Sequence, residues 1–210
     1  GEKTEQAVRD FQRRNGLTPS GIVDANMWEH LWPPAPLPVA QTPPPQGDIR
    51  IEVDTTRLTL TVYVDDKVYK TYPVAVGRPT RYTLSPVGEW KIVYKGVNWG
   101  GGFGTRWLGL NVPWGIYGIH GTNKPGSIGT RASAGCIRMH NRDVEELYEW
   151  VPLGTPVRII GEIPAHLTFR RILRPGSTGD DVVFVQLQLD KMGFGTQGAD
   201  GRFGPNTEAA

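Results

Sequence analysis

The chain has 210 residues, of which 23 are Lys or Arg and 21 are Asp or Glu, so its net charge is +2 at neutral pH. A charge this small excludes a nucleic-acid-binding footprint spread over the whole chain. The 27 glycines and 18 prolines exclude a helical bundle, and the single cysteine excludes a disulfide framework or a zinc site built from cysteine pairs. No apolar run approaches the roughly 18 residues that a membrane-spanning helix needs.

Residues 1–32 predict two short helices joined by a turn. Val8 and Phe11 share one face of the first helix, which is expected to end at Gly16. Asp24 can cap a second helix with the apolar residues Met27, Trp28 and Leu31. Residues 33–47 follow as a semi-rigid linker, with seven prolines between positions 33 and 45.

Residues 48–162 predict a mostly β domain. Apolar and polar residues alternate from Ile49 to Val64, which indicates half-buried strands with a tight turn near Asp65 and Asp66. Further strands are expected over 68–76, 89–95, 112–119 and 156–160. One helix is expected, capped by Asn141 or Asp143 and ended by Pro152 and Gly154.

The tail, residues 168–210, returns to helical patterning. Its segment 180–192 alternates like a strand, but its length and Gly193 favour a helix. Residues 204–210 repeat residues 1–7 at Gly, Thr, Glu and Ala. The tail segment 200–210 resembles the first half of the peptidoglycan-binding domain 1 family, and segments 11–17 and 21–24 resemble its second half.

This resemblance makes 168–210 the first half, and 1–32 the second half, of a small helical wall-binding module. Neither half alone can bury its apolar face, so we expect the two halves to pair within one chain or between two chains. The alternative is that each half belongs to a separate module.

Candidate catalytic residues are restricted to one stretch. The sequence has no His-Glu-x-x-His, Ser-x-x-Lys, Gly-x-Ser-x-Gly or phosphate-loop motif, and no cofactor is expected. The glycine-rich run 100–104 precedes no helix and is interpreted as a flap. What remains is His120-Gly121 followed by Ser133-Ala-Gly-Cys136-Ile-Arg138. An imidazole beside a thiol lowers the pKa of the thiol and later protonates a leaving amine, and N–H groups near Gly135 can form an oxyanion hole.

The local charge suits an anionic substrate. Residues 95–142 contain no Asp or Glu and six basic residues: Lys95, Arg106, Lys124, Arg131, Arg138 and Arg142. Such a field attracts carboxylates, and Arg138 can grip one with two hydrogen bonds. His140, His30 and His166 are expected to be structural. A lone cysteine is more often a buried apolar residue than a nucleophile, but the surrounding motif reverses that expectation.

His120-Gly121 with Ser133-Ala-Gly-Cys136-Ile-Arg138-Met is similar to the signature of the YkuD-type L,D-transpeptidases, and Ser85-Pro-Val-Gly88 resembles that family's strand start. The resemblance implies a β-sandwich catalytic domain, with Cys136 as nucleophile, His120 as base and the Gly121 carbonyl orienting the imidazole. Ser133 and Gly135 complete the catalytic set, and Arg138, Asn141, Trp99 and Tyr82 are expected to bind substrate. Many members carry His where this chain has Ala134, so His120 has to act alone.

By this resemblance the protein is expected to cross-link bacterial peptidoglycan stem peptides through an acyl-enzyme, and so to serve cell-wall organisation and cell shape. Carbapenems are expected as covalent inhibitors, and the cell wall as its location, with any export signal outside this sequence. Alternatives are an L,D-carboxypeptidase, a wall-binding protein without activity, and an unrelated cysteine peptidase. The last is disfavoured because no Asn or Asp partner stands in a matching motif.

Overall fold

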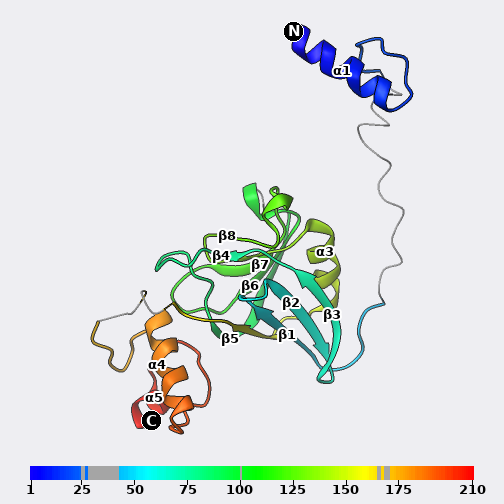
Figure 1. Ribbon diagram of the computed structural model, residues 1–210. Coiled ribbons are helices and arrows are strands. Elements are labelled where there is room, and N and C mark those ends of the chain that lie inside the picture. Colours follow the sequence, from blue (N-terminus) through cyan, green and yellow to red (C-terminus); the bar gives the residue numbers. More distant parts are fainter. Residues whose placement is uncertain (25–26, 28–42, 100, 165–166, 168–170) are drawn as a thin grey trace. The chain divides into compact units, whose positions relative to one another are not determined.

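The computed structural model describes residues 1–24, 27, 43–99, 101–164, 167 and 171–210. The chain divides into two compact units, Gly1–Pro43 and Pro44–Ala210 (Figure 1). No helix in these described ranges is long and apolar enough to cross a membrane. The mainly β class is confirmed, since strands form the body of the second unit.

The first unit contains helix α1 (Glu2–Arg14), which ends close to the predicted Gly16. A buried glutamine anchors the loop that follows. Gln12 is 1% exposed, accepts a hydrogen bond from the N–H of Gly21 at 2.9 Å and donates one to the carbonyl of Ile22 at 2.9 Å. Asp24 accepts the N–H of Met27 at 2.8 Å, as a helix cap does. Trp28, Leu31 and most of the proline-rich linker lie outside the described residues.

The second unit is built on two sheets. Its strands are β1 (Ile49–Asp54), β2 (Thr59–Val64), β3 (Lys67–Pro73), β4 (Val76–Gly77), β5 (Gly88–Val97), β6 (Arg106–Leu110), β7 (Tyr117–His120), β8 (Arg131–Ser133), β9 (Ile137–Arg138) and β10 (Pro156–Ile160). Eight of them form one sheet in the order β3-β2-β1-β10-β5-β6-β7-β9, and β4 pairs with β8. Two short 3-10 helices, Gly101–Phe103 and Pro125–Ser127, lie in the connections.

The predicted alternation of apolar and polar residues agrees with the way β1 and β2 pair. Ile51 and Val53 of β1 are buried opposite Val62 and Leu60 of β2, and the residues between them are more exposed. The tight turn joins β2 to β3, and both its central residues have positive φ, +48° at Asp65 and +62° at Asp66.

Several strands differ from expectation. The expected strand 68–76 is divided into β3 and β4, and the short strands β8 and β9 were not expected. The segment 112–119 is a strand only from Tyr117, because Pro113 and Gly115 lie in a loop before it. Strand β6 was not expected at all. Trp107 to Leu110 are all buried, so a strand in the middle of the sheet shows no polar alternation to reveal it.

Helix α3 (Asn141–Trp150) is confirmed and packs against β6 and β7. The expected cap at Asn141 or Asp143 is wrong, because His140 holds the N-cap position and no side chain caps the helix. Val144 and Leu147 are buried on its inner face. The ammonium of Lys95 donates to the carbonyls of Tyr148 at 2.6 Å and Val151 at 2.8 Å, so this lysine satisfies the C-terminal end of the helix.

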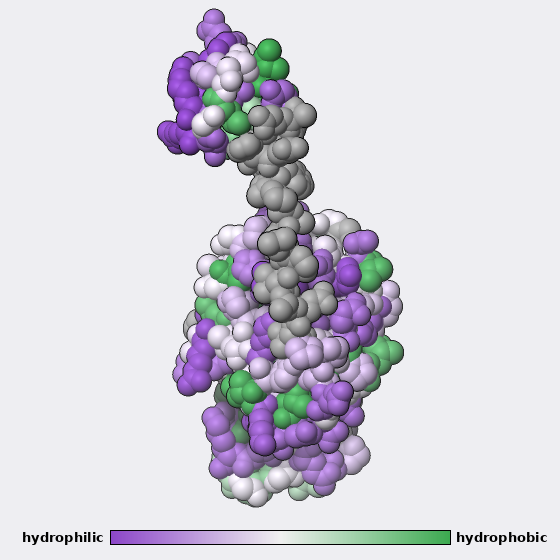
Figure 2. All heavy atoms as spheres, turned by 90° about the vertical axis from the view of Figure 1, so that its right-hand side faces the viewer, coloured by the Kyte–Doolittle hydropathy of each residue, from purple (hydrophilic) through white to green (hydrophobic). Residues whose placement is uncertain are grey.

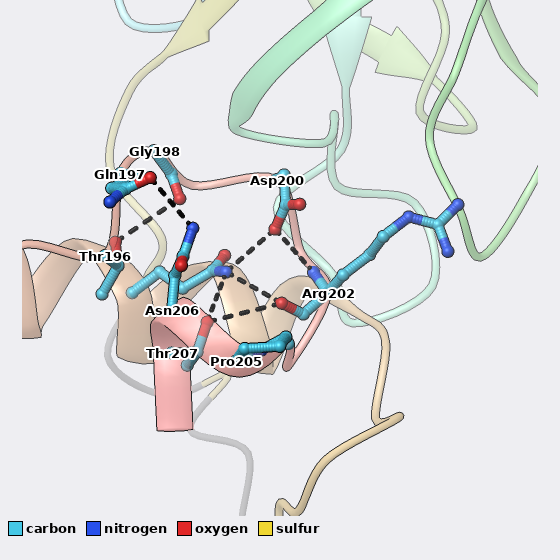
Figure 3. A pocket seen from close by; sticks show the side chains of 10 residues that line it. Thr196, Gln197, Gly198, Asp200, Arg202, Pro205, Asn206 and Thr207 are labelled. Atoms are coloured by element: carbon cyan, nitrogen blue, oxygen red, sulfur yellow. Dashed lines mark hydrogen bonds between the residues drawn. The ribbon is translucent and has the colours of Figure 1, made fainter. Parts of the chain in front are cut away.

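The tail contains helix α4 (Asp180–Lys191) and the short helix α5 (Pro205–Ala209), so the helical interpretation of 180–192 is confirmed. A second buried glutamine links these elements by hydrogen bonds. Gln186 accepts the N–H of Gly201 at 2.9 Å and donates to Thr207 at 3.0 Å and to the carbonyl of Arg202 at 3.1 Å. Beside it lies a polar hollow of about 310 Å³, which Figure 3 shows with Asp200, Arg202 and Thr207 at its wall.

Apolar residues on the surface are scattered where the structure can be viewed. Figure 2 shows them as separate patches among hydrophilic residues on one face of the second unit.

Candidate active site

Strands β7 and β9 bring the His120 and Cys136 motifs together. The two strands are parallel, with Ile119 opposite Ile137 and His120 opposite Arg138. Cys136 immediately precedes β9, and side chains two residues apart share a face of a strand. Arg138 and His120 therefore lie on the same side of this sheet edge, and the charge of Arg138 acts on both His120 and Cys136, although 16 residues separate the thiol from the imidazole in sequence.

The imidazole of His120 is buried and held in one orientation. Its Nδ1 lies 2.5 Å from the carbonyl oxygen of Gly121, which accepts the Nδ1 proton and leaves Nε2 as the basic nitrogen. The ring stacks on Trp107, with centroids 5.3 Å apart, and meets the edge of Phe103 at 5.0 Å. Burial lowers the pKa of His120 to about 4. The imidazole is thus neutral at physiological pH.

Asn141 holds the backbone behind this imidazole. Its Oδ1 accepts the N–H of Thr122 at 2.9 Å. A Cβ at Gly121 or at Gly104 would lie 2.2 Å from the same oxygen, so neither position has room for a side chain. The amide oxygen of Asn141 is therefore engaged within the protein, and a role of this residue in binding substrate stays a prediction.

Two buried serines fix the loop that carries the thiol. Ser133 donates to the carbonyl of Cys136 at 2.6 Å and accepts the N–H of Gly135 at 3.0 Å. Ser85 donates to the carbonyl of Gly135 at 2.9 Å and accepts the N–H of Gly77, also at 2.9 Å. The N–H of Gly135 donates to Ser133 and is therefore not free to bind an oxyanion, which differs from the expectation.

Gly135 is required where it stands. Its φ is +125°, and a Cβ there would lie 2.7 Å from Cε1 of Tyr117. The sulfur of Cys136 lies 3.9 Å from the carbonyl oxygen of Ile116, toward which its S–H can point. Gly135 and Cys136 therefore both lie directly against segment 116–117. Sequence reasoning missed Ile116 and Tyr117, and no motif in the sequence marks them.

The thiol is not activated in advance. Burial raises the pKa of Cys136, and the backbone of Gly118 and the charge of Arg138 offset this only in part. The expected depression of this pKa is therefore wrong. Together with the low pKa of His120, the raised pKa gives a resting site in which the thiol and the imidazole are both uncharged.

Arg138 is the basic residue best placed for an anion. It lies opposite His120 in the β7–β9 register and is partly buried. Among the described residues its Nε finds no hydrogen-bond partner, which leaves a buried donor available. Lys95 and Arg106 instead face Tyr148 of α3, at 4.2 and 5.4 Å from its ring centroid.

Aromatic residues form the wall on the His120 side. The ring of Trp99 lies 4.3 Å from that of Trp107, between centroids, and 5.7 Å from that of Phe103. This stack connects the partly exposed Trp99 to the imidazole. Tyr82 is 85% exposed, and the guanidinium of Arg81 lies 5.9 Å from its ring centroid. Its place in a substrate site stays a prediction.

Comparison with family models matches residues 48–159 to the L,D-transpeptidase catalytic domain and residues 1–31 to a "Putative peptidoglycan binding domain". The chain is 53% identical over 110 residues to "Putative L,D-transpeptidase YkuD" of Bacillus licheniformis and 50% identical over 109 residues to that of Bacillus subtilis. Each alignment covers 52% of this chain and 64% of the relative, so the chain matches less than two thirds of these proteins. L,D-transpeptidase 3 from Mycobacterium tuberculosis aligns with a TM-score of 0.49 and 17% identity, over 54% of this chain and 61% of that one.

The catalytic-domain match spans more than half of the chain and contains the whole β7–β9 site, with the thiol, the imidazole and the arginine. The resemblance seen in the sequence is confirmed for this domain and for residues 1–31. The chain belongs to the L,D-transpeptidase catalytic domain family.

Proposed function

We propose that this protein is a peptidoglycan L,D-transpeptidase that uses Cys136 to form an acyl-enzyme with a tetrapeptide stem and passes the acyl group to an amine. The observation that carries the proposal is the neutral, buried imidazole of His120, in register with the strand that follows Cys136. A neutral imidazole can accept the thiol proton, and an uncharged thiol needs such a base.

The first half of the reaction forms the thioester. Nε2 of His120 takes the proton from Sγ as the sulfur attacks the carbonyl carbon of the diamino acid. The carbon–nitrogen bond to the terminal D-residue then breaks, and the proton on Nε2 passes to the leaving amine. Arg138 fits the carboxylate of the stem, because its Nε lacks a partner among the described residues.

The second half returns the enzyme to its starting state. The acceptor amine attacks the thioester carbonyl and gives a proton to Nε2, a new amide bond forms, and Sγ leaves and recovers that proton. With the amine of a neighbouring stem the product is a cross-link. With water the same acyl-enzyme yields an L,D-carboxypeptidase, which is the second candidate function.

The terminal segments fit a role in wall binding. Residues 1–32 would supply the second half and 168–210 the first half of a peptidoglycan-binding helical module, joined to the catalytic domain 48–162 by the linker 33–47. Stem peptides and glycan are then the partners. The protein would act outside the cytoplasm, at the bacterial cell wall, and contribute to its organisation and to cell shape.

The test is incubation with purified muropeptides followed by mass spectrometry. We expect release of the terminal D-residue and cross-linked dimers with the unchanged protein, and neither with Cys136→Ala. Tripeptide products without dimers would make the protein a carboxypeptidase. A protein that folds but never forms an acyl-enzyme would be a wall-binding protein, and the proposal would fail.

Carbapenems give a second, independent readout of the same thiol. Opening of the β-lactam by Sγ leaves a stable thioester, so intact-mass measurement should show one adduct per chain. The adduct should be missing from Cys136→Ala. Absence of an adduct after long incubation of the unchanged protein would contradict an accessible nucleophile.

A further inference from the structure

The C-terminal tail packs directly on the catalytic sheet. Val183 of α4 and Ala199 of the following loop belong to one buried cluster with Trp90 of β5 and Leu110 of β6. The N–H of Glu89 donates to the carbonyl of Ala199 at 3.2 Å. Apolar packing and a backbone hydrogen bond thus join the tail to the domain that carries the thiol.

The backbones approach so closely at this joint that glycine is needed on both sides. A Cβ at Gly201 would lie 2.2 Å from Cζ3 of Trp114 and 3.0 Å from Cγ2 of Val183. A Cβ at Gly88 would lie 2.6 Å from the carbonyl oxygen of Ala199. Trp114 therefore sits against the tail with no space between them.

Trp114 connects this joint to the thiol. It lies in the loop 111–116 between β6 and β7, with its ring centroid 6.5 Å from that of Tyr117. The Tyr117 ring fills the space beside Gly135, and the Ile116 carbonyl faces the Cys136 sulfur. The negative charge of Asp180 at the start of α4 also acts on Tyr117, raising its pKa in addition to the larger effect of burial. One chain of contacts runs from the tail to Gly135 and Cys136.

We infer that the tail unit, residues 179–204, is a positioning element of the active site: by holding Trp114 it fixes the loop 111–116 and with it the surroundings of the Cys136 thiol. The inference rests on the proposed function in so far as it concerns turnover. Val112 anchors the start of this loop in the buried cluster, whereas Gly115 and Ile116 are exposed. The geometry of 113–116 therefore depends on Trp114, which packs on Trp90 of β5, with ring centroids 5.4 Å apart, and on the tail at Gly201.

The tail is suited to this role because hydrogen bonds link its own elements to one another. Gln186 ties α4 to the 200–202 loop and to α5 through the hydrogen bonds around the hollow in Figure 3. Arg171 pairs with Asp181 at the start of α4. These interactions hold in place the part of the tail that contacts Trp114.

The experiment compares Val183→Ala with Val182→Ala in the full chain. Both valines are 0% exposed, so both changes cost similar packing within the tail. Of the two, the described cluster shared with the catalytic sheet includes Val183 and not Val182. Two readouts are measured: kcat and KM with muropeptides, and the rate of Cys136 alkylation by iodoacetamide from pH 6 to 10.

We expect Val183→Ala to lower kcat by roughly tenfold with KM little changed, because a small misplacement of reacting groups costs rate. Its alkylation rate should shift by at least about threefold relative to the unchanged protein. Val182→Ala should leave both near their original values. Equal effects of the two variants, or alkylation unchanged in Val183→Ala, would overturn the inference. The alkylation readout decides the matter even if no transpeptidation is found.

A glycine pair covers the case in which Val183→Ala fails to fold. Gly201 and Gly193 both have positive φ in the tail, +66° and +89°, so alanine strains the backbone at either position. At Gly193 the new Cβ would meet nothing within 4 Å, whereas at Gly201 it would meet Trp114. Gly201→Ala should change the alkylation rate and Gly193→Ala should not. The same rate in both variants would overturn the inference.

Discussion

In the proposed mechanism, the resting charge of Cys136 and His120 decides how the thiol is activated. Burial raises the pKa of Cys136 and lowers that of His120, so the charge-separated thiolate–imidazolium pair is disfavoured. The proton then has to pass from the Cys136 thiol to His120 when the substrate binds. The bound substrate displaces water and supplies the carbonyl carbon that the sulfur attacks. His120 acts as a general base in this scheme and not as the permanent partner of a thiolate.

The pH dependence of activity follows from this arrangement. The pKa of His120 lies at about 4, so kcat/KM should be flat between about pH 5 and 7 and fall as the imidazole is protonated near pH 4. Alkylation of free Cys136 should still be rising above pH 8.5, about the ordinary thiol value, because its pKa is raised. An alkylation rate that reaches its plateau by pH 6 would instead indicate a preformed thiolate.

A matched pair of histidines tests which one is the base. His120→Gln should lower kcat/KM by about 10²–10⁴, the usual contribution of general-base catalysis. His140 precedes α3 at its N-terminal end, so His140→Gln should leave turnover nearly intact. An equal loss in both variants would refute the assignment of His120.

The prediction for Arg138 concerns recognition. If its guanidinium binds the stem carboxylate, Arg138→Ala should lower kcat/KM. The loss of transition-state stabilisation should correspond to about 1.5–3 kcal/mol, as expected for a charge-assisted hydrogen bond. Arg138→Lys should recover only part of this, since an ammonium lacks the two-pronged geometry. Arg131→Ala, an exposed arginine of the same stretch, is the control. Full activity of Arg138→Ala would make this arginine structural.

At the scale of elements, amphipathic segments were predictable and segments buried on both faces were not. The alternation over 49–64 and the helix 141–150 follow from one-sided burial. Strand β6 has no exposed face, and Trp114 of the loop 111–116 packs on the tail at Gly201, 87 positions further along the chain. The candidate residues of the site were predicted from their motif, but the pKa of Cys136 depends on burial that only the fold supplies.

The same helix–loop unit occurs twice in the chain. Gln12 in α1 and Gln186 in α4 each accept a glycine N–H and donate to the carbonyl of the next residue, with Gly21 and Gly201 both at positive φ. The motif comparison did not single out these glutamines. Their equivalence is visible only once the loops fold back onto the helices, because nine residues separate the first pair and 15 the second.

Helix α4 carries a pH-sensitive group at its start. Burial, and to a lesser extent the charge of Asp181, raises the pKa of Asp180 from 3.8 to about 7. Between these two values the folded protein holds a proton that the unfolded chain has lost, so stability should fall as pH rises from about 4 to 7. Above pH 7 this partly buried carboxylate is charged and the loss is complete.

Asp180→Asn should remove this dependence. We expect the variant to unfold at a higher temperature than the unchanged protein at pH 8 and at a similar temperature at pH 4. Glu208→Gln, at an exposed position of α5, is the control and should leave the pH profile unchanged. Parallel pH profiles for Asp180→Asn and the unchanged protein would contradict a buried carboxyl in α4.

At the scale of the whole molecule, apolar residues remain uncovered in both terminal segments. Ile22 is 67% exposed in the first unit, and in the tail Met192 and Phe194 are 65% and 49% exposed. The tail directs Val183 and Ala199 to the catalytic sheet, which leaves these other residues for the expected pairing with 1–32. The pairing of the two half-modules, within or between chains, thus stays a prediction that is compatible with the packing of α4.

Pairing of the half-modules can be tested by one surface charge. Ile22→Asp places a carboxylate where an apolar contact is expected, and its exposed position means that neither segment needs it to fold. We expect faster amide hydrogen exchange across 180–204 in this variant. Val68→Asp is the matched control, because Val68 is 64% exposed on strand β3. Sedimentation of the unchanged protein distinguishes a monomer, paired within the chain, from a concentration-dependent dimer. Exchange in the tail that is indifferent to Ile22→Asp would assign the two segments to separate modules.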